Sequence, residues 1–298
     1  MSKGLIIKAL SGFYYVLDND SKEIFECRAR GKFRKSEFAP LCGDNVEYSV
    51  TAQDKGVVDS VFPRKNSLVR PAVANIDKLI IVAAAKSPSP NTFVIDKVIM
   101  NAENNDIEPI LVFNKSDLSD DSRKFCEIYS NAGFESICVS AKTGEGIDKI
   151  LPFIDGCVCA FTGNSGVGKT SIINAIAPEY NLSTAEISEK LGRGRHTTRH
   201  IELYKVGGGY IIDTPGFSSF DNERCGFVRK ENVALCFRDF LPYVDGCKFT
   251  GCSHTKEKGC AVIEAVNSGK IEKSRFESYL RLYEQSAAIP DWQIDKHN

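Results

Sequence analysis

The chain has 298 residues, of which 42% are hydrophobic and 26% charged, and its formal net charge is −1. This length allows two or three domains with a sizeable core, and the charge excludes a chain that is basic throughout. No apolar run is long enough to cross a bilayer, and the N-terminal stretch MSKGLIIKALSG lacks the features of a signal peptide. Because the eleven cysteines also predict a reducing compartment, we expect a cytoplasmic protein without a membrane partner.

Residues 1–68 contain short runs rich in β-branched and aromatic residues, separated by Gly, Asp, Asn or Pro. Strands are predicted over residues 6–10, 12–18, 23–29, 45–50 and 56–62. Five short strands fit a small barrel, and the OB-fold is a barrel of this kind that binds RNA. Sandwich-like and SH3-like barrels fit the strand pattern almost as well.

Two basic stretches interrupt the otherwise balanced charge. The first, CRARGKFRK (27–35), lies in the predicted barrel, and the second is KLGRGRHTTRH (190–200). Local basic runs in a neutral protein can present a phosphate-binding face. The residues predicted to contact RNA are Arg28, Arg30, Lys32, Arg34 and Lys35.

From about residue 69 to 220 the pattern changes to apolar strands that alternate with helical stretches. Strands are predicted over residues 79–85, 109–114, 136–141, 157–163 and 209–216. Strands that are apolar throughout, with helices between them, indicate a parallel sheet covered on both faces. The third segment, residues 221–298, holds a Cys/His cluster and a helical stretch over 259–288.

The sequence GNSGVGKT (163–170) matches the phosphate-binding P-loop pattern between a predicted strand and a predicted helix. Its glycines allow backbone N–H groups to face phosphates, and the following helix contributes its N-terminus. Lys169 is expected to bridge the β- and γ-phosphates, and Thr170 to ligate Mg²⁺.

NKSD (114–117) follows an earlier strand, and SAK (140–142) follows the next one. Asp117 can accept from N1–H and the 2-amino group of guanine, whereas adenine would leave the carboxylate unpaired. Lys115 would lie over the base, and the Ala141 N–H would be available to the guanine oxygen. The residues predicted to contact GTP are Asn114, Lys115, Ser116, Asp117, Ser140, Ala141, Lys142, Gly163, Asn164, Ser165, Gly166, Val167, Gly168, Lys169, Thr170 and Ser171.

DTPG (213–216) ends the strand after the P-loop helix. Asp213 is expected to hold Mg²⁺ through water, and the Gly216 N–H to contact the γ-phosphate. Thr198, in preference to Thr197, is the candidate that completes the Mg²⁺ shell. Many GTPases place Gln directly after this motif, but this chain has Phe217. His196 is a candidate for positioning the attacking water, and a histidine facing solvent or RNA is an equal alternative.

Cys247, Cys252, His254 and Cys260 have the spacing C-x4-C-x-H-x5-C. Three thiolates and one imidazole make a closed tetrahedral shell suited to one structural Zn²⁺, without an open position for catalysis.

These motifs together resemble the bacterial circularly permuted GTPases that depend on the small ribosomal subunit. The features that carry the resemblance are PLCGDNV in the barrel, the order NKSD, SAK, GNSGVGKT, GRGRHTTR and DTPG, and CKFTGCSH…GCAV. It implies an OB-fold (1–68), a permuted P-loop GTPase domain (69–220) and a helical zinc-binding domain (221–298). It also implies GTP hydrolysis stimulated by the small subunit, and a role in late maturation of that subunit. EKGC (257–260) stands where the family pattern has Glu-Pro-Gly-Cys.

Permutation attaches the DTPG segment to the zinc-binding domain and the barrel to the other end of the nucleotide domain. We therefore expect GTP to control how the flanking domains bind and release ribosomal RNA. We also expect the protein to be a monomer. One alternative is an RNA-binding module in which GTP is only a structural ligand, since Phe217 cannot polarise water. A second alternative, a P-loop ATPase or kinase, is disfavoured by Asp117.

Overall fold

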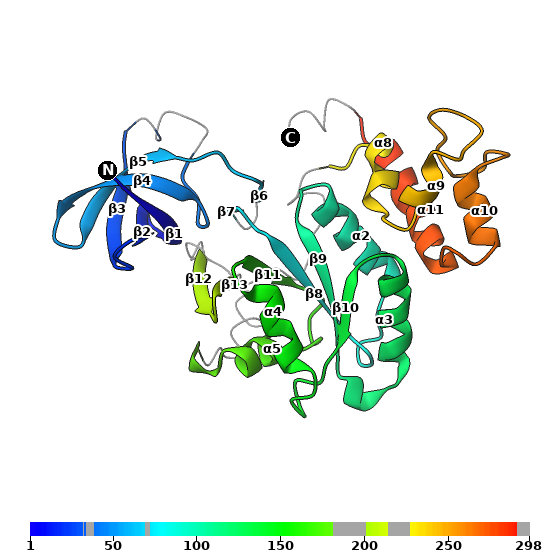
Figure 1. Cartoon of the computed structure of the whole chain (residues 1–298), viewed down its shortest axis with the longest axis horizontal. Coiled ribbons are helices and arrows are strands. Elements are labelled where there is room, and N and C mark those ends of the chain that lie inside the picture. The colour runs from blue at the N-terminus through cyan, green and yellow to red at the C-terminus, as the bar shows by residue number, and fades with distance from the viewer. Residues whose placement is uncertain (32, 34–38, 69–71, 181–200, 214–226, 291–298) are drawn as a thin grey trace, which may run out of the picture.

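The computed structural model describes residues 1–31, 33, 39–68, 72–180, 201–213 and 227–290. Figure 1 shows a small β-barrel, a central sheet with helices on both faces, and a helical C-terminal part beside the helix α2 (Thr92–Glu103). Within these residues, no helix is both long and apolar enough to cross a membrane. The predicted domain boundaries at residues 68 and 220 stay predictions.

The N-terminal part is a closed five-stranded barrel. Its strands are β1 (Ser2–Leu10), β2 (Phe13–Asp18), β3 (Ile24–Ala29), β4 (Asn45–Ala52) and β5 (Lys55–Val61). Strand β1 pairs with both β2 and β4, and the circuit is completed by β2–β3, parallel β3–β5 and β5–β4. Its core includes Ile6, Val16 and Tyr48. This order of pairings, with β1 shared between β2 and β4 and with β3 parallel to β5, confirms the predicted OB-fold barrel.

The central sheet has the order β10-β9-β8-β11-β13, with all neighbours parallel. A short hairpin, β6 (Ser67–Leu68) with β7 (Val73–Ala74), precedes it. The central strands are β8 (Lys78–Ala84), β9 (Glu108–Asn114), β10 (Glu135–Cys138), β11 (Val158–Thr162) and β13 (Gly209–Asp213). Because the strands are parallel, their carboxyl ends meet at one edge of the sheet.

Helices cover both faces of this sheet, as predicted (Figure 1). The α2 and α3 residues Ile99 and Tyr129 pack into one core cluster, and the α4 and α5 residues Ile154 and Ile172 into another. The helices are α2 (Thr92–Glu103), α3 (Asp121–Asn131), α4 (Leu151–Ile154) and α5 (Lys169–Ile176). Short 3-10 turns occur at η1 (Ser116–Leu118), η2 (Ile147–Ile150) and η3 (Pro178–Tyr180).

One strand that the sequence analysis did not predict joins the barrel to the central sheet. Strand β12 (Ile201–Val206) pairs antiparallel with β13 and, at its first two residues, with β1. Lys8 and Glu202 face each other across this junction, with Nζ and Oε2 3.2 Å apart. The barrel and the central sheet therefore form one continuous eleven-stranded sheet.

The C-terminal part is helical and packs against α2. Its elements are α8 (Lys230–Val233), η4 (Ala234–Cys236), α9 (Leu241–Val244), α10 (Ala261–Asn267) and α11 (Lys273–Ala287). Met100 of α2 belongs to the same core cluster as Phe237 and Tyr279. The stretch 259–288, predicted as helical, is two helices because Gly269 takes a positive φ of 75° after α10.

Candidate functional site

The P-loop lies between the end of β11 and the start of α5, as the sequence pattern predicted. Gly163 and Gly168 have φ values of 141° and 96°. A Cβ on Gly163 would lie 2.1 Å from the Val82 carbonyl oxygen, and a Cβ on Gly168 would lie 2.2 Å from Asn114 Nδ2. Both positions therefore need glycine for the close approach as well as for the backbone conformation.

Lys169 begins α5, and its ammonium group lies over its own loop. Its Nζ donates to the carbonyl oxygens of Gly163, at 2.5 Å, and Asn164, at 3.0 Å. Burial lowers the pKa of Lys169. Thr170 follows in the first turn and is buried, whereas Asn164, Ser165, Gly166 and Ser171 are exposed. The loop thus presents a lysine and the N-terminus of an eight-residue helix at one place.

Asn114, the last residue of β9, connects three motifs that are far apart in sequence. Its Nδ2 donates to the Val167 carbonyl oxygen at 2.8 Å, and its Oδ1 accepts from the Ala141 N–H at 3.0 Å. The side chain is 2% exposed. The structure therefore assigns Asn114 to holding NKSD, SAK and the P-loop together. It also engages the Ala141 N–H, which the sequence analysis had left available to a base.

Two further residues of NKSD contact the neighbouring loops. Lys115 has a left-handed backbone, with φ 63°, and its Nζ donates to the Gly166 carbonyl oxygen at 2.8 Å and to that of Ser87. The exposed Asp117 accepts at Oδ1 from the hydroxyl of buried Ser140 at 2.7 Å. Ser140 Oγ in turn accepts from the Thr143 N–H at 3.2 Å. The Ser140 bond orients the Asp117 carboxylate beside the SAK loop, and Lys115 joins NKSD to the P-loop.

The remaining predicted residues of the two base loops have different environments. The Ser116 N–H donates to the Val139 carbonyl oxygen at 3.1 Å, which joins the NKSD loop to the end of β10. Lys142 is exposed. Two residues were not predicted from the sequence: Ser87, which contacts Lys115 from another loop, and Thr143, which holds Ser140 within the SAK loop.

Several predicted residues fall outside the part of the chain that the structure describes. They are Lys32, Arg34, Lys35, His196, Thr197, Thr198, Gly216 and Phe217. Asp213 is the last residue of β13, but its side chain also lies outside the described part.

The two described arginines of the first basic run lie on the barrel. Arg30 Nε is 2.6 Å from Asp59 Oδ1. The Arg28 guanidinium lies 4.7 Å from the centre of the Phe13 ring. Arg28 and Phe13 thus form a cation–π pair, and side chains of both types can stack on bases. Phe13 was not predicted from the sequence.

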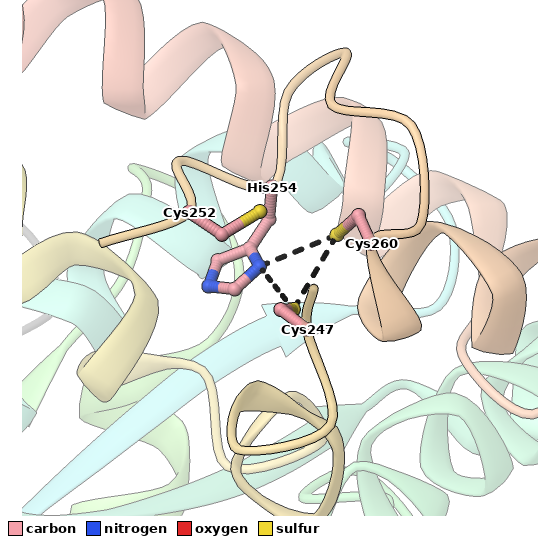
Figure 2. Close-up of side chains that lie close together, drawn as sticks. All are labelled: Cys247, Cys252, His254 and Cys260. Carbon is pink, nitrogen blue, oxygen red and sulfur yellow. Dashed lines mark hydrogen bonds between the residues drawn. The ribbon is translucent and has the colours of Figure 1, made fainter. Parts of the chain in front are cut away.

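The predicted zinc ligands come together in the C-terminal part, as Figure 2 shows. Cys247 Sγ is 3.8 Å from Cys260 Sγ and 3.5 Å from His254 Nδ1, and His254 Nδ1 is 3.4 Å from Cys260 Sγ. The four ligand atoms, including Cys252 Sγ, lie within 4.8 Å of one another. Thiolates around a tetrahedral Zn²⁺ lie about 3.8 Å apart, given a Zn–S distance of about 2.3 Å. The cluster therefore fits a tetrahedral metal ion.

Glu257 shapes the loop that carries His254. Its carboxylate accepts from the N–H groups of Ser253 and Thr255, both at 2.9 Å, and of Lys256 at 3.0 Å. Burial opposes ionisation, but the Ser253 hydroxyl and these N–H donors lower the pKa of Glu257 to about 2. Sequence reasoning missed this role, although an acidic residue three positions before Cys260 was a visible signal.

The site joins a P-loop to two base-recognition loops at the carboxyl ends of parallel strands, and NKSD precedes the P-loop in the chain. This arrangement defines a circularly permuted P-loop GTPase.

Comparison with known families specifies the class further: the chain belongs to the RsgA GTPase family. The family model for the RsgA GTPase matches residues 61–223, and that for the RsgA N-terminal domain matches residues 3–58.

Similar proteins cover nearly the whole length of the chain. It is 43% identical over 290 residues to the small ribosomal subunit biogenesis GTPase RsgA of Geobacillus sp. (strain WCH70), covering 96% of this chain and 97% of that protein. The RsgA of Ruminiclostridium cellulolyticum is 41% identical, with coverages of 99% and 97%.

Solved structures agree with these relatives. YloQ, a circularly permuted GTPase, superposes with a TM-score of 0.81 at 36% identity, covering 96% of this chain and 95% of its own. YjeQ from Thermotoga maritima has a TM-score of 0.84 at 35% identity, with coverages of 97% and 99%.

Proposed function

We propose that this GTPase acts on the small ribosomal subunit during its late maturation, that the subunit stimulates its GTP hydrolysis, and that the state of the nucleotide controls binding to ribosomal RNA. The observation that carries the proposal is the position of Asn114, which ties both base loops to the P-loop. The names of the relatives, small ribosomal subunit biogenesis GTPases, supply the partner.

Within the proposed site, Asp117 selects guanine and Lys115 covers the ring. Lys169 stabilises the charge that develops on the β- and γ-phosphates. Residues 163–168 and Ser171 contact the same phosphates. Mg²⁺ would be held by Thr170, Thr198 and Asp213, where it would neutralise phosphate charge. Gly216 would contact the γ-phosphate, and His196 is the candidate that positions water.

The junction between β1 and β12 supports a link from the nucleotide to the RNA-binding barrel. Strand β12 begins at Ile201, three residues after Thr198 in the sequence, and its first two residues pair with Ala9 and Lys8 of the barrel. A change around Thr198 on GTP hydrolysis would therefore be transmitted directly to the barrel strand. We propose that Arg28, Arg30, Lys32, Arg34 and Lys35 contact the RNA phosphates, with the chain acting as a cytoplasmic monomer.

The experiment that tests this function measures phosphate release from GTP with and without purified small subunits. We expect clear stimulation by the subunits. Lys169→Ala should lower the stimulated rate by roughly 10²–10³, the loss seen when one preorganised donor to transition-state charge is removed. His196→Ala should lower the rate without weakening GTP binding. Absence of stimulation would favour the alternative, an RNA-binding module that holds GTP as a structural ligand.

We also propose that Cys247, Cys252, His254 and Cys260 bind one structural Zn²⁺. Cys252→Ser should then carry substoichiometric zinc and lose the order of the loop around His254, because the folding of such a loop depends on its metal. Metal analysis of the purified chain and its circular dichroism before and after chelation test this.

A matched control for the zinc experiment is Cys236→Ser, which removes a buried cysteine of the same domain outside the cluster. It should keep one zinc per chain. Equal zinc content in Cys252→Ser and the unaltered protein would disprove the four-ligand site.

A further inference from the structure

Two cysteines outside the proposed metal site lie in direct contact. Cys126, on α3, and Cys138, the last residue of β10, have their Sγ atoms 2.7 Å apart. This separation exceeds a disulfide bond of about 2.05 Å by only about 0.7 Å. Both residues are half-buried, so a small reagent can reach them. Cys138 packs at the edge of the core cluster that includes Phe113 and Tyr129.

The surroundings make this pair differ from the other free thiols. A hydrogen bond from Cys126, opposed by burial and assisted by Ser122 and Arg123, lowers the pKa of Cys138 to about 7. A thiol with a pKa near the ambient pH is well suited to attack a disulfide. By contrast, burial raises the pKa of other thiols to about 12, namely those of Cys27, Cys42, Cys159 and Cys236.

A shared metal ion does not explain the contact. Among the described residues, the only group of three or more metal-ligating side chains is the one formed by Cys247, Cys252, His254 and Cys260. Two thiols alone give half of a tetrahedral shell. The geometry instead suits the formation of a sulfur–sulfur bond.

In the sequence, the pair lies between the two base-recognition loops, NKSD and SAK. Helix α3 begins four residues after Asp117, and Cys138 lies two residues before Ser140, whose hydroxyl orients the Asp117 carboxylate. We propose that Cys126 and Cys138 are an oxidation site that closes reversibly to a disulfide and thereby ties α3 to β10. The effect on nucleotide described below rests on the proposed function, whereas formation of the disulfide does not.

The reaction uses a small-molecule disulfide such as glutathione disulfide as the oxidant. The Cys138 thiolate attacks one of its sulfurs, the sulfur–sulfur bond breaks, and one glutathione thiolate leaves. Cys126 then gives its proton to solvent, and its sulfur attacks Cys138 Sγ to release the second glutathione. Two protein thiols are oxidised by two electrons, and one glutathione disulfide is reduced to two thiols.

The disulfide restrains the elements that support Asp117 and Ser140. Restraining a site in the arrangement that binds its ligand lowers the entropy lost on binding. Oxidation is therefore expected to slow the release of guanine nucleotide severalfold, and a dithiol reductant to restore the original rate.

The test treats the full-length, zinc-loaded protein with glutathione disulfide and digests it with trypsin without reduction. Both cysteines fall in one peptide, residues 125–142, because no Lys or Arg lies between Phe125 and Lys142. We expect this peptide to become lighter by two hydrogens. In parallel, the release of a fluorescent GDP analogue is measured before oxidation, after it and after reduction.

Two variants make the outcome specific. In Cys126→Ser, Cys138 should form a glutathione adduct but no internal disulfide. The release of the GDP analogue should therefore not slow on oxidation. Cys157→Ser, which removes another half-buried cysteine directly before β11, should oxidise like the unaltered protein. Absence of the lighter peptide would overturn the proposal. A disulfide without slower release would overturn its coupling to the loops, and failure to bind GDP at all would instead count against the proposed function.

Discussion

Arg275→Ala is expected to destabilise the protein by about 3–5 kcal/mol, the cost of leaving buried carboxylates without their cation. Arg275, on α11, is 1% exposed, as is Asp96 on α2. Its Nη1 donates to Asp96 Oδ1 at 2.6 Å, and its Nη2 and Nε donate to Asp239 at 2.8 and 3.2 Å. The guanidinium also lies 4.6 Å from the centre of the Phe237 ring. Alanine would remove every one of these contacts.

Urea unfolding followed by circular dichroism measures this effect. The matched control is Arg281→Ala on the same helix, because Arg281 is exposed and its guanidinium lies 3.7 Å from the centre of the Phe93 ring. This exposed contact should contribute about 1 kcal/mol or less. If Arg275→Ala unfolds within about 1 kcal/mol of the unaltered protein, the buried network does not hold the C-terminal helices to α2.

The same network bears on the proposed response of the flanking domains to GTP. Besides Arg275, Arg238 of the C-terminal part donates to Glu103 and to Glu108, both at 2.7 Å, across the boundary with the central domain. These contacts favour a C-terminal part that moves together with α2. The barrel meets the central sheet through two residue pairs of β1 and β12, and Cys42 of the barrel also belongs to the core cluster that contains Leu79 of β8.

The sequence predicted the features of this fold that are local. The P-loop, NKSD and SAK each follow a largely apolar strand, and parallel strands bring their ends to one edge. The zinc ligands lie within fourteen residues, so their spacing was informative without knowledge of the fold. The closed barrel followed from five short strands, although its closure by β1 and β4 became visible only in the structure.

What sequence reasoning missed depends on contacts between distant residues. Arg275 and Asp96 are 179 positions apart, and a single charge on an amphipathic helix resembles any solvated residue. Strand β12 alternates polar and apolar residues and pairs with the barrel at an edge that no local pattern specifies. The break at Gly269 could have been predicted from the sequence, because glycine commonly ends a helix with a positive φ.

Asp117→Asn is expected to reverse the choice of base. Asp117 lies exposed at the rim of the site, where Ser140 fixes one carboxylate oxygen. A carboxylate accepts from both N1–H and the 2-amino group of guanine. An asparagine side chain has only one acceptor oxygen, so its NH2 group would face one of these two donors without a hydrogen bond. Xanthine carries a carbonyl oxygen in place of the amino group and would accept from that amide.

The ratio of GTP affinity to XTP affinity should therefore fall by roughly 10⁴, the order by which sites built around a specific hydrogen bond reject an analogue. Competition of GTP, XTP and ATP against a fluorescent guanine nucleotide measures it. Asp120→Asn, an exposed substitution three residues further on, should stay within about twofold of the unaltered protein, as expected for a surface change. If Asp117→Asn still prefers GTP as strongly as before, the base is read elsewhere. If it binds XTP in place of GTP, the carboxylate in the early half of the permuted domain selects the nucleotide that the later P-loop holds.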